Sequence, residues 1–264
     1  MSTPPRILAI AGSDSSGGAG IQADIKTVTM LGGYAMTAIT AITAQNTRGV
    51  QAVETLSADL VGAQIDSCIG DIGADAIKIG MLGSPAIARA VIERLDSFDG
   101  AVVFDPVMVA TSGSVLADQD TIAAFSQLMS RATLATPNLP ELAALTGLPC
   151  DSPDQIAGAA TRLASDYGCA VLAKGGHAES TRVIDRLVHA DGSFASFDDP
   201  WIDTRHTHGT GCTLSSAIAT LLGHGQPLEH AVRLGRRFVR EALQKAPGFG
   251  AGHGPLGHQA VRGD

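Results

Sequence analysis

The chain has 264 residues, of which 45% are hydrophobic and only 4% aromatic, so it can bury a large and mainly aliphatic core. Its formal net charge of -8 and its four lysines argue against a surface that binds nucleic acid or an anionic membrane. Its four cysteines are widely separated and form no Cys-x-x-Cys pair, which predicts neither a zinc site nor a disulfide framework. Without a signal-peptide core or a membrane span in the sequence, we expect a reducing, cytoplasmic location.

The first predicted unit is a buried strand over residues 6–11, a glycine-rich loop over residues 12–20 and a helix over about 21–31. This order is typical of phosphate-binding sites, although neither the P-loop form nor Gly-x-Gly-x-x-Gly is present. The loop can still admit a small ligand close to its backbone. Asp24, one turn into the helix, either hydrogen-bonds that ligand or only favours the positive end of the helix dipole.

A second strand is predicted over residues 35–44, which are apolar and β-branched, and it ends at Gln45. An amide at a strand end suits the edge of a pyrimidine. A surface turn is the alternative, because Asn46 and Gly49 follow and both residue types favour turns.

Helices and strands then alternate. Ser57 is expected to cap a helix over residues 58 to about 72, residues 75–79 to form a strand, and Ser84 with Pro85 to begin another helix.

An apolar strand over residues 101–108 presents Asp105 near its end. Ligands of open α/β sheets bind beyond the carboxyl ends of the strands, so Asp105 is expected where the chemistry occurs. A structural role, in which Asp105 caps the following turn, is the alternative. The Gly-, Ser- and Thr-containing residues 109–118 are predicted to form a flap.

A helix over about 119–131 and a strand over 133–136 lead to Asn138 and Glu141. These groups either hold magnesium, directly or through water, or form a capping box at the start of a helix, and both roles can coexist.

Next, a helix over residues 154–167 and a strand over 169–173 lead to Lys174, which precedes two glycines and is placed to face nucleotide phosphates. Residues 183–201 alternate in polarity around an Asp-Gly turn, which predicts a hairpin at the sheet edge.

Residues 207–215 contain two glycines separated by one residue, followed by apolar positions at helical spacing, which predicts a tight loop that becomes a helix. The free N–H groups and the positive end of the dipole would bind a phosphoryl group there. Cys212 lies in this first turn, which is expected to lower its thiol pKa towards neutrality and let it accept a proton from a substrate hydroxyl. The alternative is an ordinary helix start with Cys212 as a small core residue.

Helices over residues 212–222 and 228 to about 246 complete the pattern, and residues 248–257 are predicted to be a loop or edge segment rather than a metal site. Regular alternation predicts a single domain over residues 1–264. It is expected to be a three-layer α/β fold with a mostly parallel central sheet flanked by helices, right-handed crossovers and a small edge hairpin.

Seven stretches, in this order, resemble the hydroxymethylpyrimidine/phosphomethylpyrimidine kinases of the ThiD family, within the ribokinase-like superfamily. They are residues 10–24, 43–50, 78–82, 105–108, 136–141, 174–177 and 208–215. The resemblance extends from about residue 6 to about 258 and implies a ribokinase-like fold. Most kinases of the superfamily have Asp where this chain has Cys212, and a thiol there is usual in the ThiD family and in some pyridoxal kinases.

The resemblance implies phosphoryl transfer from Mg-ATP to 4-amino-5-hydroxymethyl-2-methylpyrimidine (HMP), and then to HMP-phosphate, in thiamine biosynthesis. Residues that match the pyrimidine-binding positions are Gly12, Asp24, Gln45, Met81 and Val107. Residues that match the nucleotide-binding positions are Asn138, Lys174, Thr207, Gly209 and Gly211. Asp105 and Glu141 match the metal environment. The implied catalytic set is Cys212 and Lys174 with the anion hole formed by Gly209, Thr210 and Gly211.

Two other functions stay open: a pyridoxine or pyridoxal kinase that uses the same site, and a non-catalytic pyrimidine-binding domain. The resemblance also implies a homodimer. It leaves open whether potassium takes part, and it assigns no adenine contacts within residues 200–205.

Overall fold

The computed structural model describes residues 3–109, 116, 119–176 and 181–261, and its centre is an eight-stranded sheet with the order β10-β9-β8-β7-β6-β5-β1-β2. The strands are β1 (Arg6–Ala11), β2 (Tyr34–Ile39), β5 (Ala76–Ile79), β6 (Ala101–Phe104), β7 (Leu134–Ala135), β8 (Ala170–Ala173), β9 (Arg182–Val188) and β10 (Phe194–Pro200). The strands from β8 to β2 run parallel, whereas β9 and β10 form the predicted antiparallel hairpin at one edge.

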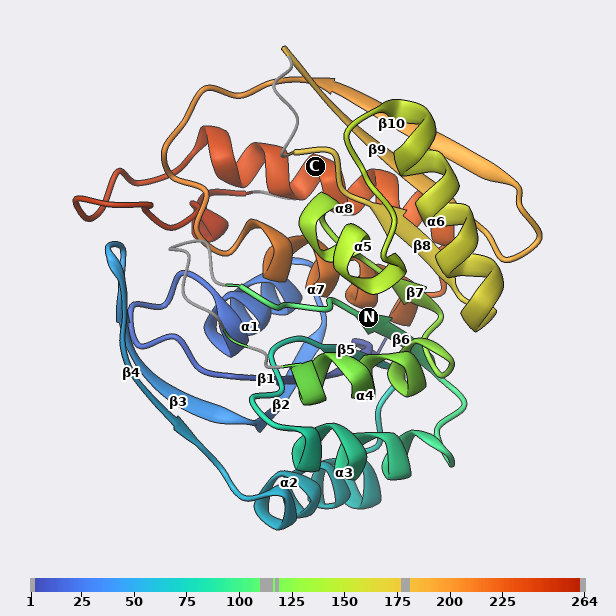
Figure 1. Ribbon diagram of the computed structural model, residues 1–264. Helices are drawn as coiled ribbons and strands as arrows, with labels where there is room; N and C mark the ends of the chain where they lie inside the picture. The colour runs from blue at the N-terminus through green and yellow to red at the C-terminus, as the bar shows by residue number, and fades with distance from the viewer. Residues whose placement is uncertain (1–2, 110–115, 117–118, 177–180, 262–264) are drawn as a thin grey trace.

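Helices cover both faces of this sheet (Figure 1). One face packs against α2 (Ala58–Asp71), α3 (Pro85–Leu95), α4 (Gln119–Met129), α5 (Leu139–Thr146) and α6 (Pro153–Tyr167). The other packs against α1 (Gly20–Met30), α7 (Thr210–Gly223) and α8 (Leu228–Gln244). Successive residues of a strand point to opposite faces, so Ile7 joins one hydrophobic core and Leu8 the other. The predicted three-layer α/β fold is confirmed.

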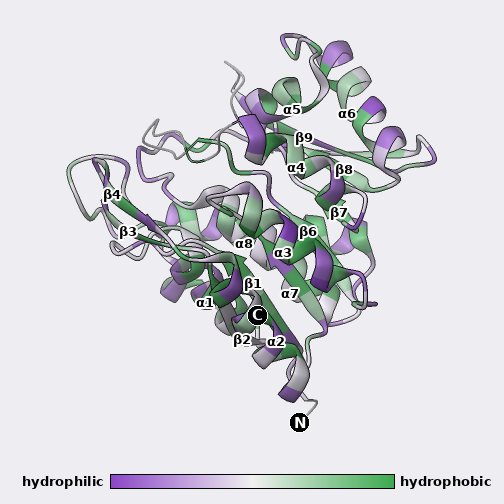
Figure 2. Cartoon of the chain, turned by 60° about the horizontal axis from the view of Figure 1, so that its bottom comes forward, coloured by the Kyte–Doolittle hydropathy of each residue, from purple (hydrophilic) through white to green (hydrophobic). Residues whose placement is uncertain are grey.

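Local sequence signals account for most element boundaries. Ser57, Ser84 and Ser152 each accept a hydrogen bond from the backbone three residues later, which satisfies one of the free N–H groups at a helix start. β5 and β8 are apolar and buried along their whole length, as strands covered on both sides must be. Figure 2 shows the hydrophobic strands inside and hydrophilic residues mainly on the outer helices and loops. None of the described helices is long and apolar enough to cross a bilayer.

The prediction of one strand over residues 35–44 is wrong. The segment divides at Thr40 into β2, in the main sheet, and β3 (Ala41–Asn46), which pairs with β4 (Gly49–Thr55) in a separate two-stranded sheet. The Thr40 hydroxyl donates to the Met81 carbonyl at 2.7 Å, which anchors the chain where it leaves β2. This contact is non-local, so the apolar run alone could not reveal the break.

The C-terminal tail is a loop, as expected, and it docks on the start of α7. Residues 208 and 255 form an isolated parallel bridge, and the short 3₁₀ helix η1 (His258–Ala260) follows. His258 is buried, and its Nε2 lies 2.8 Å from Thr213 Oγ1 on α7. The predicted flap over residues 109–118 lies almost entirely outside the described residues.

We expect the docked tail to make stability fall in mild acid. Burial lowers the pKa of His258 to about 4, against an ordinary value of 6.5. As pH falls from 6.5 to 4, the unfolded chain takes up the proton before the folded chain, so the unfolding free energy falls, by up to about 3 kcal/mol. Urea unfolding at pH 7, 5.5 and 4.5 measures this.

The variant His258→Gln should lose that part of the pH dependence, whereas His230→Gln, on α8, should keep it. Comparing each variant with the wild type removes the contributions of other groups, such as Glu141, which titrate in the same range. Parallel curves for the wild type and His258→Gln would contradict the assignment.

Candidate functional site

A cavity of about 1030 Å³ opens at the carboxyl ends of the parallel strands. Its wall contains the residues that follow β1, β6 and β8, as the position rule for open α/β sheets predicts. Every site residue expected from the sequence lies on this wall except Asp24. They are Gly12, Gln45, Met81, Asp105, Val107, Asn138, Glu141, Lys174, Thr207, Gly209, Thr210, Gly211 and Cys212.

The loop before α7 is shaped by a glycine at the helix N-cap. Gly209 has φ 86°, a left-handed conformation, and a Cβ there would lie 1.9 Å from the Gly18 carbonyl oxygen. Glycine is therefore required both by the backbone angle and by the neighbouring loop. No acidic residue occupies the first turn of α7, so the turn's N–H groups and the helix dipole can favour an anion in the cavity.

Asp105 and Lys174 form an ion pair directly beside this loop. Lys174 Nζ lies 2.9 Å from Asp105 Oδ1, which also accepts from the Thr136 hydroxyl at 3.0 Å. A Cβ at Gly211 would lie 3.3 Å from Asp105 Oδ2 and 3.4 Å from Lys174 Nζ. Burial opposes the charge of Lys174, but Asp105 and Glu141 outweigh that effect and raise its pKa. The lysine is therefore a fixed cation next to the anion loop.

Asn138 and Glu141 form the predicted capping box at the start of α5, which is confirmed. The Asn138 side chain accepts from the Glu141 backbone, and the Glu141 carboxylate accepts from the Asn138 backbone, each at 2.8 Å. Burial raises the pKa of Glu141 to about 7, and Asp105 adds to the rise while Lys174 opposes it. A nearby cation such as the Lys174 ammonium therefore stabilises the ionised form of Glu141.

Asp105 and Glu141 are the candidate metal residues. Within the described part of the chain, no three His, Cys, Asp or Glu side chains come close enough to enclose a metal ion. Mg²⁺ does not need such a cage, because it commonly binds one or two carboxylates together with substrate phosphates and water. Two carboxylates on the wall of one cavity fit that pattern.

The expectation of a lowered thiol pKa at Cys212 is wrong for this structure. Burial raises the pKa of Cys212 to about 11, and the carboxylates of Asp24 and Asp105 act in the same direction. Lys78 and a hydrogen bond from the Gly20 backbone favour the thiolate but do not outweigh burial. A helix N-terminus lowers a thiol pKa only where desolvation does not exceed it.

Asp24 does not reach the cavity, contrary to the pyrimidine-binding role that the resemblance implies. It is fully buried, and Lys78 Nζ lies 2.9 Å from both of its carboxylate oxygens. The Ser216 hydroxyl donates to Asp24 Oδ1 at 2.6 Å. These contacts join α1, β5 and α7 inside the protein, so direct contact with a substrate in the cavity is not supported.

Asp14 and His208 line the cavity, but the sequence reasoning assigned neither a role. Asp14 accepts from the backbone of Gly18 and Ala19, and its Oδ2 lies 2.7 Å from His208 Nε2. Burial alone would raise the pKa of Asp14, but these donors and Ser16 outweigh it and lower the pKa to about 2. The two residues therefore tie the loop before α1 to the loop before α7. An Asp before a Ser/Gly turn is a local signal that could have identified Asp14.

Residues from the edge hairpin, the segment after it and α8 contribute apolar side chains to the cavity wall, next to the charged Arg236 and Arg240. These apolar side chains include Val183, Trp201, Ile202, Val239 and Leu243. A flat aromatic ring fits such a wall better than a phosphate does. The adenine contacts, which the sequence left unassigned, are therefore best sought here.

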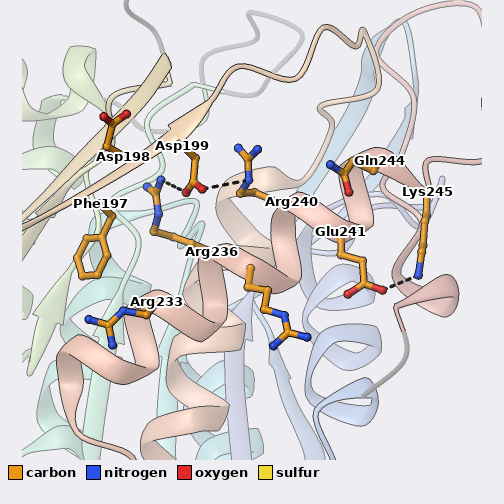
Figure 3. A pocket seen from close by; sticks show the side chains of 10 residues that line it. Phe197, Asp198, Asp199, Arg233, Arg236, Arg240, Glu241, Gln244 and Lys245 are labelled. Carbon is orange, nitrogen blue, oxygen red and sulfur yellow. Dashed lines mark hydrogen bonds and ion pairs between the residues drawn. The ribbon is translucent and has the colours of Figure 1, made fainter. Parts of the chain in front are cut away.

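A second cavity, of about 680 Å³, lies between β10 and the outer side of α8 and contains none of the predicted site residues (Figure 3). Asp199 lies between Arg236 and Arg240 and forms ion pairs with both. Arg236 also pairs with Asp185, whose Oδ1 accepts from the Gly175 backbone at 2.7 Å. Through Asp185, this network holds the backbone of Gly175, directly after Lys174.

The fold and the cavity together define a kinase of the ribokinase-like class. A solved Staphylococcus aureus pyridoxal kinase, in complex with AMP-PCP and pyridoxal, is 30% identical with a TM-score of 0.90, covering 99% of this chain and 97% of that structure.

Residues 14–257 match the phosphomethylpyrimidine kinase family, and the chain belongs to it. The Bacillus subtilis hydroxymethylpyrimidine/phosphomethylpyrimidine kinase is 40% identical over 259 residues, which cover 97% of this chain and 96% of that protein. The multifunctional thiamine biosynthesis protein ThiED of Corynebacterium efficiens is 44% identical over 261 residues, or 97% of this chain. The chain spans only 35% of the length of that ThiED protein.

We expect Gly209→Ala to damage both the fold and the anion loop, because the new methyl group would meet the Gly18 carbonyl. Gly225→Ala is the matched control, since Gly225 has a similar φ of 78° but nothing within 4 Å of its Cβ position. The control should lower the unfolding free energy by about 1–2 kcal/mol, the left-handed backbone term, and leave kcat/KM unchanged. Gly209→Ala should lower stability further and reduce kcat/KM at least tenfold. Equal effects would show that the backbone contact is unimportant.

Proposed function

We propose that this chain transfers the γ-phosphoryl group of ATP to HMP and then to HMP-phosphate, giving HMP-diphosphate for thiamine biosynthesis. The proposal rests on one observation: an anion loop, a fixed lysine and a thiol lie together on the wall of a single cavity. The family relationship supplies the substrate. A non-catalytic binding domain would need neither the lysine nor the thiol in this arrangement.

The chain's own residues act mainly by position and charge. The N–H groups of residues 209–212 and the Lys174 ammonium neutralise charge that develops on the transferring phosphoryl group. Cys212 accepts the proton of the substrate alcohol. Since its resting pKa is about 11, only its thiolate form can do so, and the nearby cations Lys78 and Lys174 favour that form.

Substrate and nucleotide occupy opposite parts of the cavity in this proposal. Gly12, Gln45, Met81 and Val107 lie around the pyrimidine. Asn138, Thr207 and Lys174 face the phosphates, and the apolar wall beside α8 receives the adenine. Asp105 and Glu141 would hold Mg²⁺, which supplies positive charge to the phosphates when bound. Potassium dependence is an open part of the proposal and has no assigned residues.

A homodimer and a cytoplasmic location complete the proposal. Tyr34, Ile42 and Val53, on β2 and on the β3–β4 hairpin, are exposed apolar side chains that a second copy could cover. A sedimentation mass equal to one chain would contradict the dimer. The use of ATP as co-substrate supports the proposed cytoplasmic location.

Pyridoxal is the second candidate substrate, because the solved structure described above holds pyridoxal in a fold that matches this one closely. We expect kcat/KM for HMP to exceed that for pyridoxal and pyridoxine. Mass analysis of the products with HMP should show one and then two added phosphates. A higher kcat/KM for the vitamin B6 compounds would reverse the assignment, and no product from either class would support a binding domain.

Replacing Cys212 should separate chemistry from binding. Cys212→Ala is expected to lower kcat by about 10²–10⁴, the usual contribution of a positioned proton acceptor, while the Kd for ATP changes little. Cys150→Ala, at a cysteine outside the cavity, is the control and should leave both values unchanged. Unchanged turnover in Cys212→Ala would remove the thiol from the reaction.

A further inference from the structure

Lys78 is the largest side chain that is fully buried in the described residues, and the mechanism gives it no direct contact with substrate. It lies on β5, inside the sheet, and ion-pairs with Asp24 on α1. Neither residue lines the cavity. Burial opposes the charge of Lys78, but Asp24, Cys212 and Asp105 together outweigh that effect and raise its pKa, so the lysine stays cationic. A buried ion pair is seldom more stable than apolar side chains of the same volume, so a reason other than stability must be sought.

The position of the pair relative to Cys212 suggests that reason. α1 and α7 lie side by side: Asp24 on α1 accepts from the Ser216 hydroxyl on α7 at 2.6 Å, and the Gly20 backbone at the start of α1 favours the thiolate form of Cys212 at the start of α7. Asp24 is four residues after Gly20, and Ser216 is four residues after Cys212, so each pair lies on one face of its helix. The ion pair therefore lies one helical turn below the thiol.

We infer that Lys78 and Asp24 are positioning residues that hold a buried ion pair beneath Cys212 and thereby set how readily it becomes a thiolate. The inference rests on the proposed role of Cys212 as proton acceptor. Lys78 favours the thiolate, whereas Asp24 opposes the thiolate and, together with Asp105, helps to keep Lys78 protonated. Around the thiol, Asp105 after β6 and Lys174 after β8 are the other charged groups that act on it, and α7 has no acidic or basic residue in its first turn.

The two halves of the pair should have opposite effects on the thiol when they are removed. In Asp24→Asn, the negative charge that opposes the thiolate is removed, while Asp105 and the thiolate itself still favour the Lys78 ammonium, so the thiolate becomes more favourable. In Lys78→Met, the thiolate loses its cation, whether or not Asp24 takes up a proton. A pair that acted only as a packing element would instead loosen the protein in both variants, which would expose the thiol in both.

The test measures alkylation of Cys212 by iodoacetamide between pH 7 and 10 in the full chain, followed by peptide mass spectrometry. We expect Asp24→Asn to accelerate alkylation at pH 8 about tenfold, the equivalent of one unit in pKa, and Lys78→Met to slow it severalfold. Cys169, which is buried in the core just before β8, reports loosening within the same sample and should keep its rate. Acceleration in both variants, or none in Asp24→Asn, would overturn the inference.

Two further readouts keep the test decisive. If Lys78→Met does not fold, Asp24→Asn decides alone, because faster alkylation at Cys212 without faster alkylation at Cys169 supports the inference and unchanged alkylation contradicts it. The rising limb of kcat against pH, measured on the same variants, tests the proposed function separately. If the pH dependence of alkylation shifts in the variants but the pH dependence of kcat does not, the ion-pair inference is supported. The same result would show that Cys212 is not the proton acceptor.

Discussion

The site depends on a backbone contact between the loop before α1 and the loop before α7. At Gly18 and Gly209 the two loops approach so closely that no side chain fits on residue 209. The contact brings segments from opposite ends of the chain together over the carboxyl edge of the sheet, and Asp14 and His208 reinforce it with a buried hydrogen bond. The orientation of the α7 dipole, the position of Cys212 and the shape of the anion loop all follow from it. A kinase that relies on few cations needs such fixed backbone donors.

The charges of the site are arranged as two lysine–aspartate pairs in a chain that is otherwise acidic. Lys174 with Asp105 faces the cavity, whereas Lys78 with Asp24 lies behind it. Both lysines follow or lie within a parallel strand, so the sheet itself positions them. Lys78 is fully buried and Lys174 is largely buried, and each keeps its charge because a carboxylate is held against it. The field at the anion loop is thus built into the fold and does not depend on mobile surface residues.

Short-range signals in the sequence predicted most elements, because their causes are local. The serine caps at residues 57 and 84, the buried strand β1 and the capping box at Asn138 and Glu141 need only neighbouring residues. The cavity wall was also predictable, since strand ends in a parallel sheet meet at one edge. The break at Thr40 could not be predicted in this way, because it depends on a hydrogen bond to Met81 from another part of the chain.

The properties that only the three-dimensional structure could reveal are those that depend on burial. Asp24 has the spacing of a residue at a ligand loop, yet its partners Lys78 and Ser216 come from distant segments and turn it inward. The thiol of Cys212 occupies a helix start, as expected, but desolvation outweighs the dipole and keeps it protonated at neutral pH. Sequence position correctly placed Cys212 in the first turn of a helix, whereas its chemical state depends on how much water the fold removes.

The β3–β4 hairpin, which carries Gln45 over the cavity, has no ladder in common with the eight-stranded sheet. Substitutions along it leave the strand pairing of the main sheet intact, so natural selection can alter the part proposed to contact the ring without disturbing the part proposed to handle phosphate. Divergence between vitamin kinases with different ring preferences then requires no redesign of the phosphoryl-transfer apparatus.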